Sequence, residues 1–480
     1  MPTACEHPRH VDIAIIGGGA SGVLVAAHLL AADVPRKSVA LIDSGPAPGR
    51  GVAYGTGAPE HLLNVPAGGM SAFADDPGDF ARFLAAGQGG EPSPGLAATF
   101  APRRDYARYL RNVLESRPGF SALEIVHDRV SDIERRDGFH LQLASGKRLH
   151  ADAVVLAIGN APRRLAVPAA LSDRLLQAWD PASLSGLPPE SDVCIVGSGL
   201  SMVDVVLTLA EAGHRGRLHV LSRHGLMPLP HATSSGHAGA AEADAAAALL
   251  EASAAGRLRL LRRMVAEASA GGDSWQRVFE RLRPHGQRLW QTWDEGEQAS
   301  FLRHLVRYWD IHRHRIAPQV HAVLTRLQES GQLRIHAGRL LAAEPATGNG
   351  CRIRYRARGT HAEESLQCDW IVNATGIETR VRARGDDLAA ALLARGLAVP
   401  GPHGLGFASR GIGEVVDAHG HVAPDLFVIG ALRLGDLWET IAVPELRQHA
   451  AGIARHLLAR GSTAPDLCEG ALGRDQLPAP

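Results

Sequence analysis

Two short apolar runs, each followed by a glycine turn and a second apolar stretch, constrain the fold of this chain more than any other feature. The first run is Val11–Ile16 with the turn Gly17–Gly22, and the second is Val193–Val196 with the turn Gly197–Gly199. Each pattern predicts a buried strand, a tight turn and a helix. The helices expected after the two turns are Val23–Leu30 and Met202–Ala212. The chain is therefore expected to contain one parallel α/β architecture twice.

Length and charge limit the classes of protein to which the chain can belong. With 480 residues and 45% hydrophobic composition, it is long enough for two to three domains. Its 50 basic and 50 acidic side chains cancel, which argues against nucleic acid or an anionic membrane as a partner. Met1–His10 is polar and no apolar stretch is long enough to cross a bilayer, so we expect a cytoplasmic protein.

The five cysteines are scattered, without a Cys-x-x-Cys pair and without the spacing of cysteine metal ligands. This pattern argues against a disulfide framework, a zinc site and a redox-active dithiol, and no metal is expected from it.

Further apolar runs extend the two units. Val39–Ile42 and Ala153–Ile158 predict buried strands of the first sheet, and Ile371–Gly376 and Leu426–Gly430 are expected to rejoin that sheet. Ala238–Gly256 is alanine-rich and suits either a helix or a surface insertion. Between Trp275 and Gln328 the spacing of apolar residues predicts amphipathic helices.

The first glycine turn has the pattern of a dinucleotide site. Gly17, Gly19 and Gly22 satisfy G-x-G-x-x-G between a strand and a helix, so that backbone amides, with that of Ser21 among them, can face a pyrophosphate. Asp43 ends the next strand, where its carboxylate can accept hydrogen bonds from ribose hydroxyls. A dinucleotide is favoured here over a merely tight turn.

The second glycine turn, with Gly197, Gly199 and Ser201, has Met202 in place of the third glycine. The following strand ends in Ser222 and Arg223 rather than in an acid, which favours the 2′-phosphate of NADPH over the bare ribose of NADH. The alternative, that Arg223 is a solvated surface charge, stays open, and so does NADH.

Two further glycines follow apolar strands, Gly159 and Gly376, the latter after Thr375, and would let the chain pass close to a cofactor. We predict two Rossmann-like dinucleotide-binding domains, with a discontinuous FAD domain, an inserted NAD(P) domain and a helical segment. The expected ranges are 1–180 for the first part of the FAD domain, 190–345 for the NAD(P) domain with a helical insertion at about 236–328, 346–470 for the return segment and 471–480 for a tail.

Several local motifs resemble those of one family, the bacterial FAD/NAD(P)-binding proteins related to flavin-dependent N-hydroxylating monooxygenases, some of which oxidise aspartate. The likeness runs over nearly the whole chain. It is carried by the segments Gly49–Gly55, His61–Pro66, Met70–Phe73, Asp192–Asp204, Phe301–His304, Tyr308–Pro318 and Gly435–Thr440.

The resemblance implies FAD, a nicotinamide nucleotide, and oxygen transfer from a flavin C4a-hydroperoxide to the uncharged amino group of a small amino acid or amine. It implies that His61 and Asn64 lie in a flavin-covering loop, although an ordinary loop cap is the alternative. Other cofactor-binding residues expected on this basis are Ser44, Arg50, Asn64, Met70, Gly430, Asp436 and Trp438. We expect Trp438–Thr440 to begin a helix beside the flavin.

The densest basic cluster lies between residues 303 and 315, and Arg303, His312 and Arg313 are its candidate catalytic residues. Guanidinium groups match carboxylates, so the cluster would suit a dicarboxylate such as aspartate. Successive helical residues point in different directions, so the cluster cannot face one pocket as a whole. Trp290, Trp293 and Trp309 are expected to be packing residues.

Two other functions remain open. A flavin-dependent NAD(P)H oxidoreductase without oxygen insertion would share both dinucleotide sites, and the absence of Cys-x-x-Cys excludes only its disulfide-reductase version. A redox-sensing flavoprotein is the non-enzymatic alternative. The motif F-x-G-x-x-x-H-x-x-x-W, typical of Baeyer-Villiger oxygenases, is missing.

Overall fold

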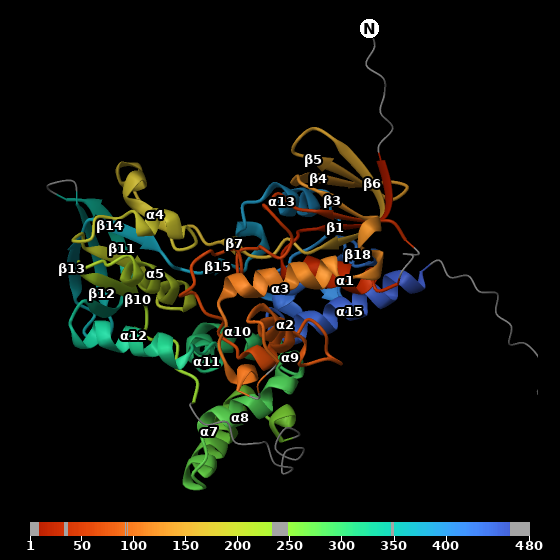
Figure 1. Ribbon diagram of the computed structural model, residues 1–480. Coiled ribbons are helices and arrows are strands. Elements are labelled where there is room, and N and C mark those ends of the chain that lie inside the picture. Colours follow the sequence, from red (N-terminus) through yellow and green to blue (C-terminus); the bar gives the residue numbers. More distant parts are fainter. Residues whose placement is uncertain are drawn as a thin grey trace, which may run out of the picture.

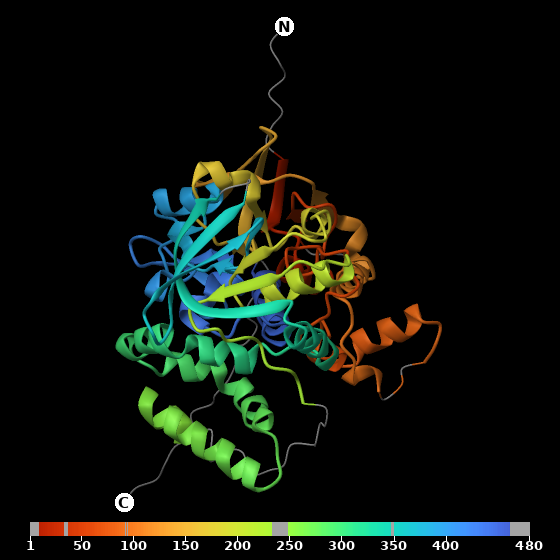
Figure 2. The ribbon, with the colours of Figure 1, turned by 90° about the vertical axis from the view of Figure 1, so that its left-hand side faces the viewer.

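The computed structural model describes residues 9–32, 37–91, 93, 95–232, 248–346 and 350–460. Figure 1 shows two lobes, each built on its own sheet, with a group of helices below them. The view in Figure 2 shows the helices of residues 254–291 packed at one end of the molecule. The observed α/β class with two parallel sheets confirms the predicted fold class.

The first sheet has five parallel strands at its centre, in the order β18-β6-β1-β2-β3. Their bounds are β1 (Arg9–Ile16), β2 (Val39–Ile42), β3 (Leu123–Val126), β6 (Arg148–Leu156) and β18 (Val422–Val428). Buried aliphatic side chains of β1 and β2 pack under α1 (Ala20–Leu29), α3 (Arg103–Glu115) and α15 (Val443–Ala459). The predictions of strands at Val11–Ile16 and Val39–Ile42 are confirmed, and the strand predicted at Leu426–Gly430 is β18, which begins earlier and ends at Val428.

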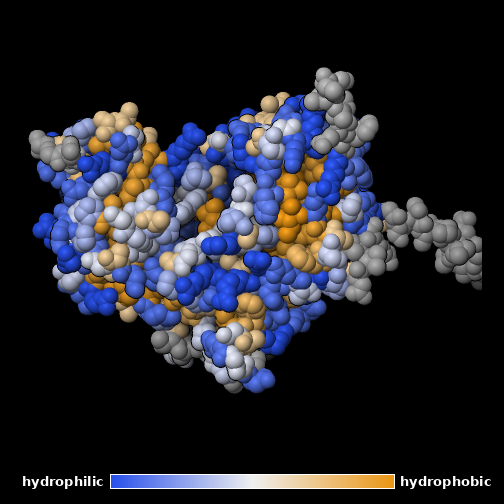
Figure 3. Space-filling view, turned by 45° about the horizontal axis from the view of Figure 1, so that its top comes forward, coloured by the Kyte–Doolittle hydropathy of each residue, from blue (hydrophilic) through white to orange (hydrophobic). Residues whose placement is uncertain are grey.

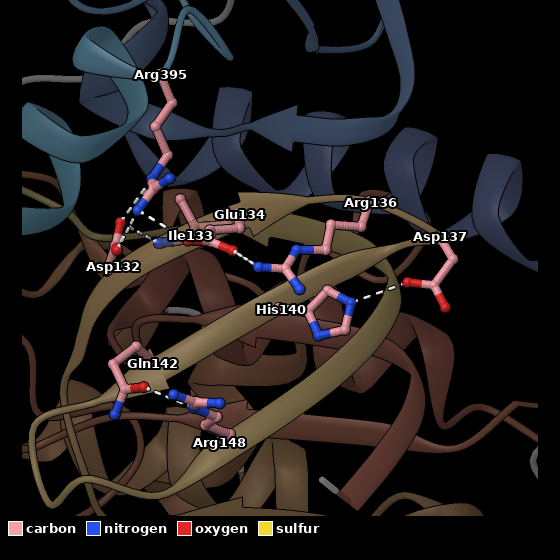
Figure 4. Close-up of polar contacts among 9 residues, drawn as sticks. All are labelled: Asp132, Ile133, Glu134, Arg136, Asp137, His140, Gln142, Arg148 and Arg395. Carbon is pink, nitrogen blue, oxygen red and sulfur yellow. Dashed lines mark hydrogen bonds and ion pairs between the residues drawn. The ribbon is translucent and has the colours of Figure 1, made fainter.

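Antiparallel strands extend this sheet at two places. The additional strands are β4 (Val130–Arg135), β5 (Phe139–Leu143), β16 (Ser409–Arg410) and β17 (Glu414–Val416). The hairpin β4–β5 pairs with the beginning of β6, which is why that strand is longer than the predicted Ala153–Ile158. α13 (Asp387–Ala394) packs against β4, and Arg395 binds the Asp132 carboxylate with two nitrogens, at 2.6 and 3.0 Å (Figure 4).

The second sheet has the order β13-β12-β11-β10-β9-β14-β8, with a parallel core from β11 to β8. Its strands are β8 (Leu175–Gln177), β9 (Val193–Val196), β10 (Leu218–Ser222), β11 (Leu333–Pro345), β12 (Cys351–Ala357), β13 (Glu363–Cys368) and β14 (Trp370–Asn373). The helices α4 (Pro181–Ser185), α5 (Leu200–Glu211) and α12 (Pro318–Glu329) belong to this lobe.

The prediction that Ile371–Gly376 rejoins the first sheet is wrong. Strand β14 pairs with β9 and β8, so it completes the second sheet. A short buried apolar run is equally suited to the interior of either sheet, and only the tertiary pairing distinguishes them. Strands β12 and β13, which fall in the predicted return segment, also pair within the second sheet.

The chain crosses between the two sheets twice, and the two crossings lie side by side. Strand β7 (Ala161–Pro162) pairs antiparallel with β15 (Ile377–Glu378), and the Arg163 amide donates to the Gly376 carbonyl at 3.0 Å. Gly159 and Gly376 precede these crossings with φ of +61° and +84°, values that favour glycine. The second unit is therefore inserted into the first.

Helices between the second sheet's strands form the predicted helical segment. They are α7 (Ala254–Ala270), α8 (Trp275–Leu282), α9 (Gly286–Gln291), α10 (Glu295–His304) and α11 (Val306–Arg313). Of the Ala238–Gly256 stretch, residues 238–247 lie outside the described residues. Further helices are α2 (Asp79–Gly87) and α14 (Leu434–Leu437), and several short 3-10 turns also occur. Among the described residues, every helix is too short or too polar to cross a membrane.

Candidate functional site: two glycine turns and the cleft between them

The first glycine turn is built so tightly that glycine is required at two positions. Gly17 has φ of +108°, and a Cβ there would lie 2.3 Å from the Ala157 carbonyl oxygen. A Cβ at Gly22 would lie 1.9 Å from the Gly17 carbonyl oxygen. These contacts hold α1 close to β1 and β6, so that the helix N-terminus stands at the carboxyl end of the sheet.

The N-terminus of α1 offers unpaired backbone donors to an anion. Gly19 is the N-cap without a side-chain cap, and the first intrahelical bond of the turn runs from the Val23 amide to the Gly19 carbonyl at 3.0 Å. The amides of Ser21 and Gly22 precede that bond and are free for a ligand. Asp43, at the end of β2, accepts hydrogen bonds from the amides of Gly18 and Gly45. This arrangement fits a dinucleotide diphosphate and its ribose.

The loop after β2 runs along the turn. The Gly49 amide donates to the Gly18 carbonyl at 2.7 Å, and a Cβ at Gly51 would lie 3.0 Å from the Gly19 Cα. Ser44 and Arg50 are exposed in this loop, whereas Met70 is buried in the core beneath it. Their contacts with a cofactor remain predictions.

The second turn repeats this geometry. Gly197 has φ of +114°, and a Cβ there would lie 2.1 Å from the Ala374 carbonyl oxygen. Gly199 is the uncapped N-cap of α5 with open space around it, and Ser201 lies in the first turn of the helix. Met202 is fully buried in the core of the second lobe, where the third glycine of the pattern would leave α5 closer to β9. The second helix N-terminus therefore also fits a diphosphate.

Cationic side chains gather at the end of β10. Arg223 is exposed, and partial desolvation together with the positive charges of Arg307, Arg163 and Arg339 lowers its pKa. Ser222 is fixed beside it by a hydrogen bond of its hydroxyl with Ser198, at 2.8 Å. Asp310 and Glu378 balance part of the charge on Arg307 and Arg163. The remaining positive charge suits a phosphate monoester.

His61 lies at the junction of the two lobes. It is buried, its Nδ1 lies 2.9 Å from the Thr56 hydroxyl, and its Nε2 lies 2.9 Å from the Thr208 hydroxyl on α5. Both ring nitrogens thus have protein partners, and the predicted contact with flavin stays a prediction. Asn64, half-buried, accepts a hydrogen bond at its carbonyl from His231 of the second unit, at 2.9 Å.

An ion pair that sequence reasoning missed ties the lobes together. Arg103, on α3, binds the carboxylate of Asp204, on α5, with Nη1–Oδ2 and Nη2–Oδ1 distances of 2.6 and 3.0 Å. The Arg103 Nε donates to the Leu62 carbonyl at 3.1 Å. The pair fixes the first lobe's cofactor loop against the helix that begins at the second glycine turn. Figure 3 shows the surface hollowed between the two lobes.

The structure separates the residues of the basic cluster, as expected for successive helical positions. Arg303 is exposed on α10, and His312 bonds through Nδ1 to the Tyr308 carbonyl at 2.7 Å. Arg313 forms a buried ion pair with Glu439, at 3.2 Å. Through this ion pair Arg313 contacts the segment that follows β18.

That segment returns to the first glycine turn. Gly430 has φ of +73°, and a Cβ there would lie 3.1 Å from the Ser21 hydroxyl. Asp436 is half-buried and accepts hydrogen bonds from the backbone amide and hydroxyl of Ser409, at 2.8 and 2.5 Å. Burial raises the pKa of Asp436, against these hydrogen bonds and Arg433. Its predicted contact with a cofactor stays a prediction.

The prediction that Trp438–Thr440 begins a helix is wrong. α14 ends at Leu437 and α15 begins at Val443, with Trp438 between them at φ of +58°. Trp438 stacks on Trp290, with ring centroids 5.2 Å apart, and the Trp290 indole donates to the Gly435 carbonyl at 2.8 Å. Trp290, Trp293 and Trp309 pack in one cluster with Trp438.

We expect His449 on α15 to make the protein sensitive to acid. Burial, with the positive charge of Arg433, lowers the pKa of His449 to about 4. The folded protein holds this ring neutral, whereas the unfolded chain protonates it below about pH 6.5. Stability is therefore lost as the pH falls from about 6.5 to about 4, by up to about 3 kcal/mol from this group. Urea unfolding at a series of pH values measures this loss. The free energy of unfolding of His449→Leu should fall less with decreasing pH than that of the wild type. His421→Leu, at an exposed histidine, should show the same fall as the wild type.

Comparison with known proteins gives one family match and several structures of the same fold. Residues 14–161 match a family of FAD-NAD(P)-binding domains. The match covers the first glycine turn and the first part of the unit built on the first sheet. No curated protein sequence matches the chain.

Solved structures share the fold of almost the whole chain at low sequence identity. The FAD-bound cadaverine monooxygenase DfoA of Erwinia amylovora is 13% identical, with coverage of 98% of this chain and 99% of that one and a TM-score of 0.64. The ornithine N-hydroxylase KtzI of Kutzneria sp. 744, solved with reduced FAD, NADP+ and L-ornithine, is 12% identical, with coverage of 94% and 99% and a TM-score of 0.61.

The same fold also occurs in a reductase. The bacillithiol disulfide reductase Bdr of Bacillus cereus is 14% identical, with coverage of 94% of this chain and 100% of that one and a TM-score of 0.52. The chain thus has the fold of flavoprotein monooxygenases and reductases.

Proposed function

We propose that this protein is an FAD- and NADPH-dependent monooxygenase that N-hydroxylates the amino group of a small amino acid or amine. The observation that carries the proposal is the pair of helix N-termini without side-chain caps, at Gly19 and Gly199, together with the positive charge at the end of β10. The fold that holds them is shared with a cadaverine monooxygenase and an ornithine N-hydroxylase. We further propose that FAD binds at the first turn and NADPH at the second.

The residues present fit these two cofactors. The free amides of Ser21 and Gly22 and the carboxylate of Asp43 would hold the diphosphate and a ribose of FAD. The amides at the start of α5 would hold the NADPH diphosphate, and Arg223 would bind its 2′-phosphate. When bound, FAD supplies electron transfer from the nicotinamide and activation of oxygen.

The chain's own contribution would be positioning and the exclusion of water. The Arg103–Asp204 pair and His61 hold the two cofactor loops at a fixed separation. The substrate must present an uncharged nitrogen, since only its lone pair can attack an electrophilic oxygen. The separated positions of Arg303, His312 and Arg313 do not favour aspartate over a diamine, so the substrate remains to be chosen by assay.

The test follows NADPH oxidation, oxygen consumption and peroxide release by the FAD-loaded protein with cadaverine, ornithine, lysine and aspartate. Amine-stimulated oxygen use without matching peroxide, and a product that has gained one oxygen atom on nitrogen, would support the proposal. If no amine stimulates turnover while an artificial acceptor is reduced quickly, the proposal fails for these substrates and an oxidoreductase without oxygen insertion becomes the favoured function. That alternative is favoured by the shared fold of the bacillithiol disulfide reductase.

We expect Arg223→Ser to alter the choice of nucleotide. Loss of a guanidinium that binds the 2′-phosphate should raise the KM for NADPH at least about tenfold, equivalent to about 1.4 kcal/mol, and leave the KM for NADH unchanged. Stopped-flow reduction of the flavin measures both. Arg352→Ser, at an exposed arginine on β12, is the control. Equal effects on the two nucleotides would contradict the assignment.

A further inference from the structure

Three histidines stand in register on neighbouring strands of the first sheet, far along the strands from the glycine turn. His140 on β5 is paired with His150 on β6, and His150 is paired with His10 on β1. The ring centroids of His140 and His150 are 4.6 Å apart, and those of His10 and His150 are 5.0 Å apart. Directly paired residues of adjacent strands project from the same face of a sheet. The three imidazoles therefore form one row.

A carboxylate lies between two of these rings. Asp137 precedes β5, and its Oδ1 lies 2.9 Å from the His140 Nε2 and 3.8 Å from the His150 Nε2. Figure 4 shows the Asp137 side chain directed toward His140 at the end of the hairpin. Asp137 is 80% exposed and His150 only 16%, so the group opens to solvent on the carboxylate side.

The His150 Nε2 is buried without a hydrogen-bond partner. A buried polar atom of this kind costs free energy unless something binds it. The approach to this atom is kept open by Gly138, because a Cβ there would lie 2.6 Å from it. An unpartnered ring nitrogen beside a carboxylate and a second imidazole is the donor set of a transition-metal ion.

We propose that Asp137, His140 and His150 bind a divalent first-row transition ion such as Zn²⁺, with water as the fourth ligand. A tetrahedral ion with ligand distances of roughly 2.0–2.2 Å holds its ligand atoms roughly 3.4 Å apart. The two observed separations from the Asp137 oxygen, 2.9 and 3.8 Å, lie on either side of this value. Small side-chain rotations thus complete the site.

A second group competes for the same histidine. His10 and Asp152 lie 2.8 Å apart beside His150, but their side chains are 49% and 54% exposed. The group with Asp137 is favoured because the Asp137 carboxylate faces the unpartnered His150 Nε2, at 3.8 Å, and because His140 makes the tighter of the two ring contacts with His150.

The experiment is a Zn²⁺ titration of the full-length, FAD-loaded protein, freed of tags and treated with a chelator, in competition with a chromogenic chelator. We expect one tight ion per chain, and an affinity at least about tenfold lower in His140→Ala and His150→Ala. His421→Ala is the matched control, since His421 forms another exposed pair with an aspartate, Asp417, at 3.4 Å. Flavin absorbance and circular dichroism verify that each variant is folded.

Co²⁺ provides a second readout. Its visible absorption should show coordination by nitrogen and oxygen in the wild type, and this spectrum should change in Asp137→Asn. Tight binding that survives in both His140→Ala and His150→Ala would overturn the proposal. A wild-type protein that binds the ion no more tightly than these two variants would overturn it as well. Loss of binding in His10→Ala and Asp152→Asn but not in His140→Ala would overturn the assignment of Asp137 and His140.

Discussion

Replacing Gly17 with alanine is expected to yield a protein that no longer retains FAD. The glycine has φ of +108°, and the new Cβ would lie 2.3 Å from the Ala157 carbonyl oxygen, which belongs to the backbone directly after β6. Relief of this contact must move the turn and the amides at the start of α1. We expect the affinity for FAD to fall at least about 100-fold, or about 2.7 kcal/mol.

The ratio of flavin absorbance to protein absorbance after purification measures this effect, followed by titration with FAD. Gly57→Ala is the matched control, because a Cβ at Gly57 meets no atom within 4 Å and its φ is not positive. Gly19→Ala separates binding from folding. A Cβ at Gly19 would have the Gly51 Cα as its nearest neighbour, at 3.5 Å, so this variant should fold normally and reports only the effect of a side chain at the turn on FAD binding. A Gly17→Ala protein with a full complement of flavin would refute the assignment of the first turn.

Replacing Arg103 with alanine is expected to give the second large effect, on the stability of the protein and on the rate at which NADPH reduces FAD. The side chains of Arg103 and Asp204 are only 18% and 13% exposed. Removal of the guanidinium leaves a largely buried carboxylate without its cation, which should lower the free energy of unfolding by about 3 kcal/mol. Because the pair positions α5 against the first lobe's loop, reduction of FAD by NADPH should also slow.

The same helix supplies the control. Arg111 pairs with Glu115 at 2.7 Å, but the two side chains are 58% and 43% exposed. Arg111→Ala should therefore cost less than about 1 kcal/mol and leave flavin reduction unchanged. Denaturant unfolding and stopped-flow reduction of the two variants give the comparison. Equal losses in both would show that the pair between the lobes has no special role, and recovery of stability in Arg103→Ala/Asp204→Ala would show that the unpaired charge causes the loss.

Local features of the sequence were sufficient to predict the two glycine turns. A strand, a turn and a helix follow one another within some twenty residues, and Gly17 and Gly197 are required by contacts with the neighbouring strand. The sequence also places Arg223 at the end of β10, where the structure leaves it exposed and where the positive charges of Arg307, Arg163 and Arg339 act on it, so its contact with a 2′-phosphate stays a prediction.

Features that depend on pairing between distant segments could not be predicted from the sequence. β14 was assigned to the wrong sheet because its apolar residues suit the interior of both. Arg103 and Asp204 are 101 residues apart, and neither stands out in composition. The cysteine spacing argued against a metal site, whereas the proposed ligands are brought together by the register of β5 and β6.

The adjacent crossings at β7 and β15 have a consequence for how such proteins can be rebuilt. Because the Arg163 amide and the Gly376 carbonyl are hydrogen-bonded, the inserted unit leaves and re-enters the first sheet at nearly the same point. Residues 163–376 can thus be treated as a cassette whose ends already meet. A nucleotide-binding unit from another flavoprotein, cut at the same two positions, should be transplantable without a change in the register of the sheet that receives it.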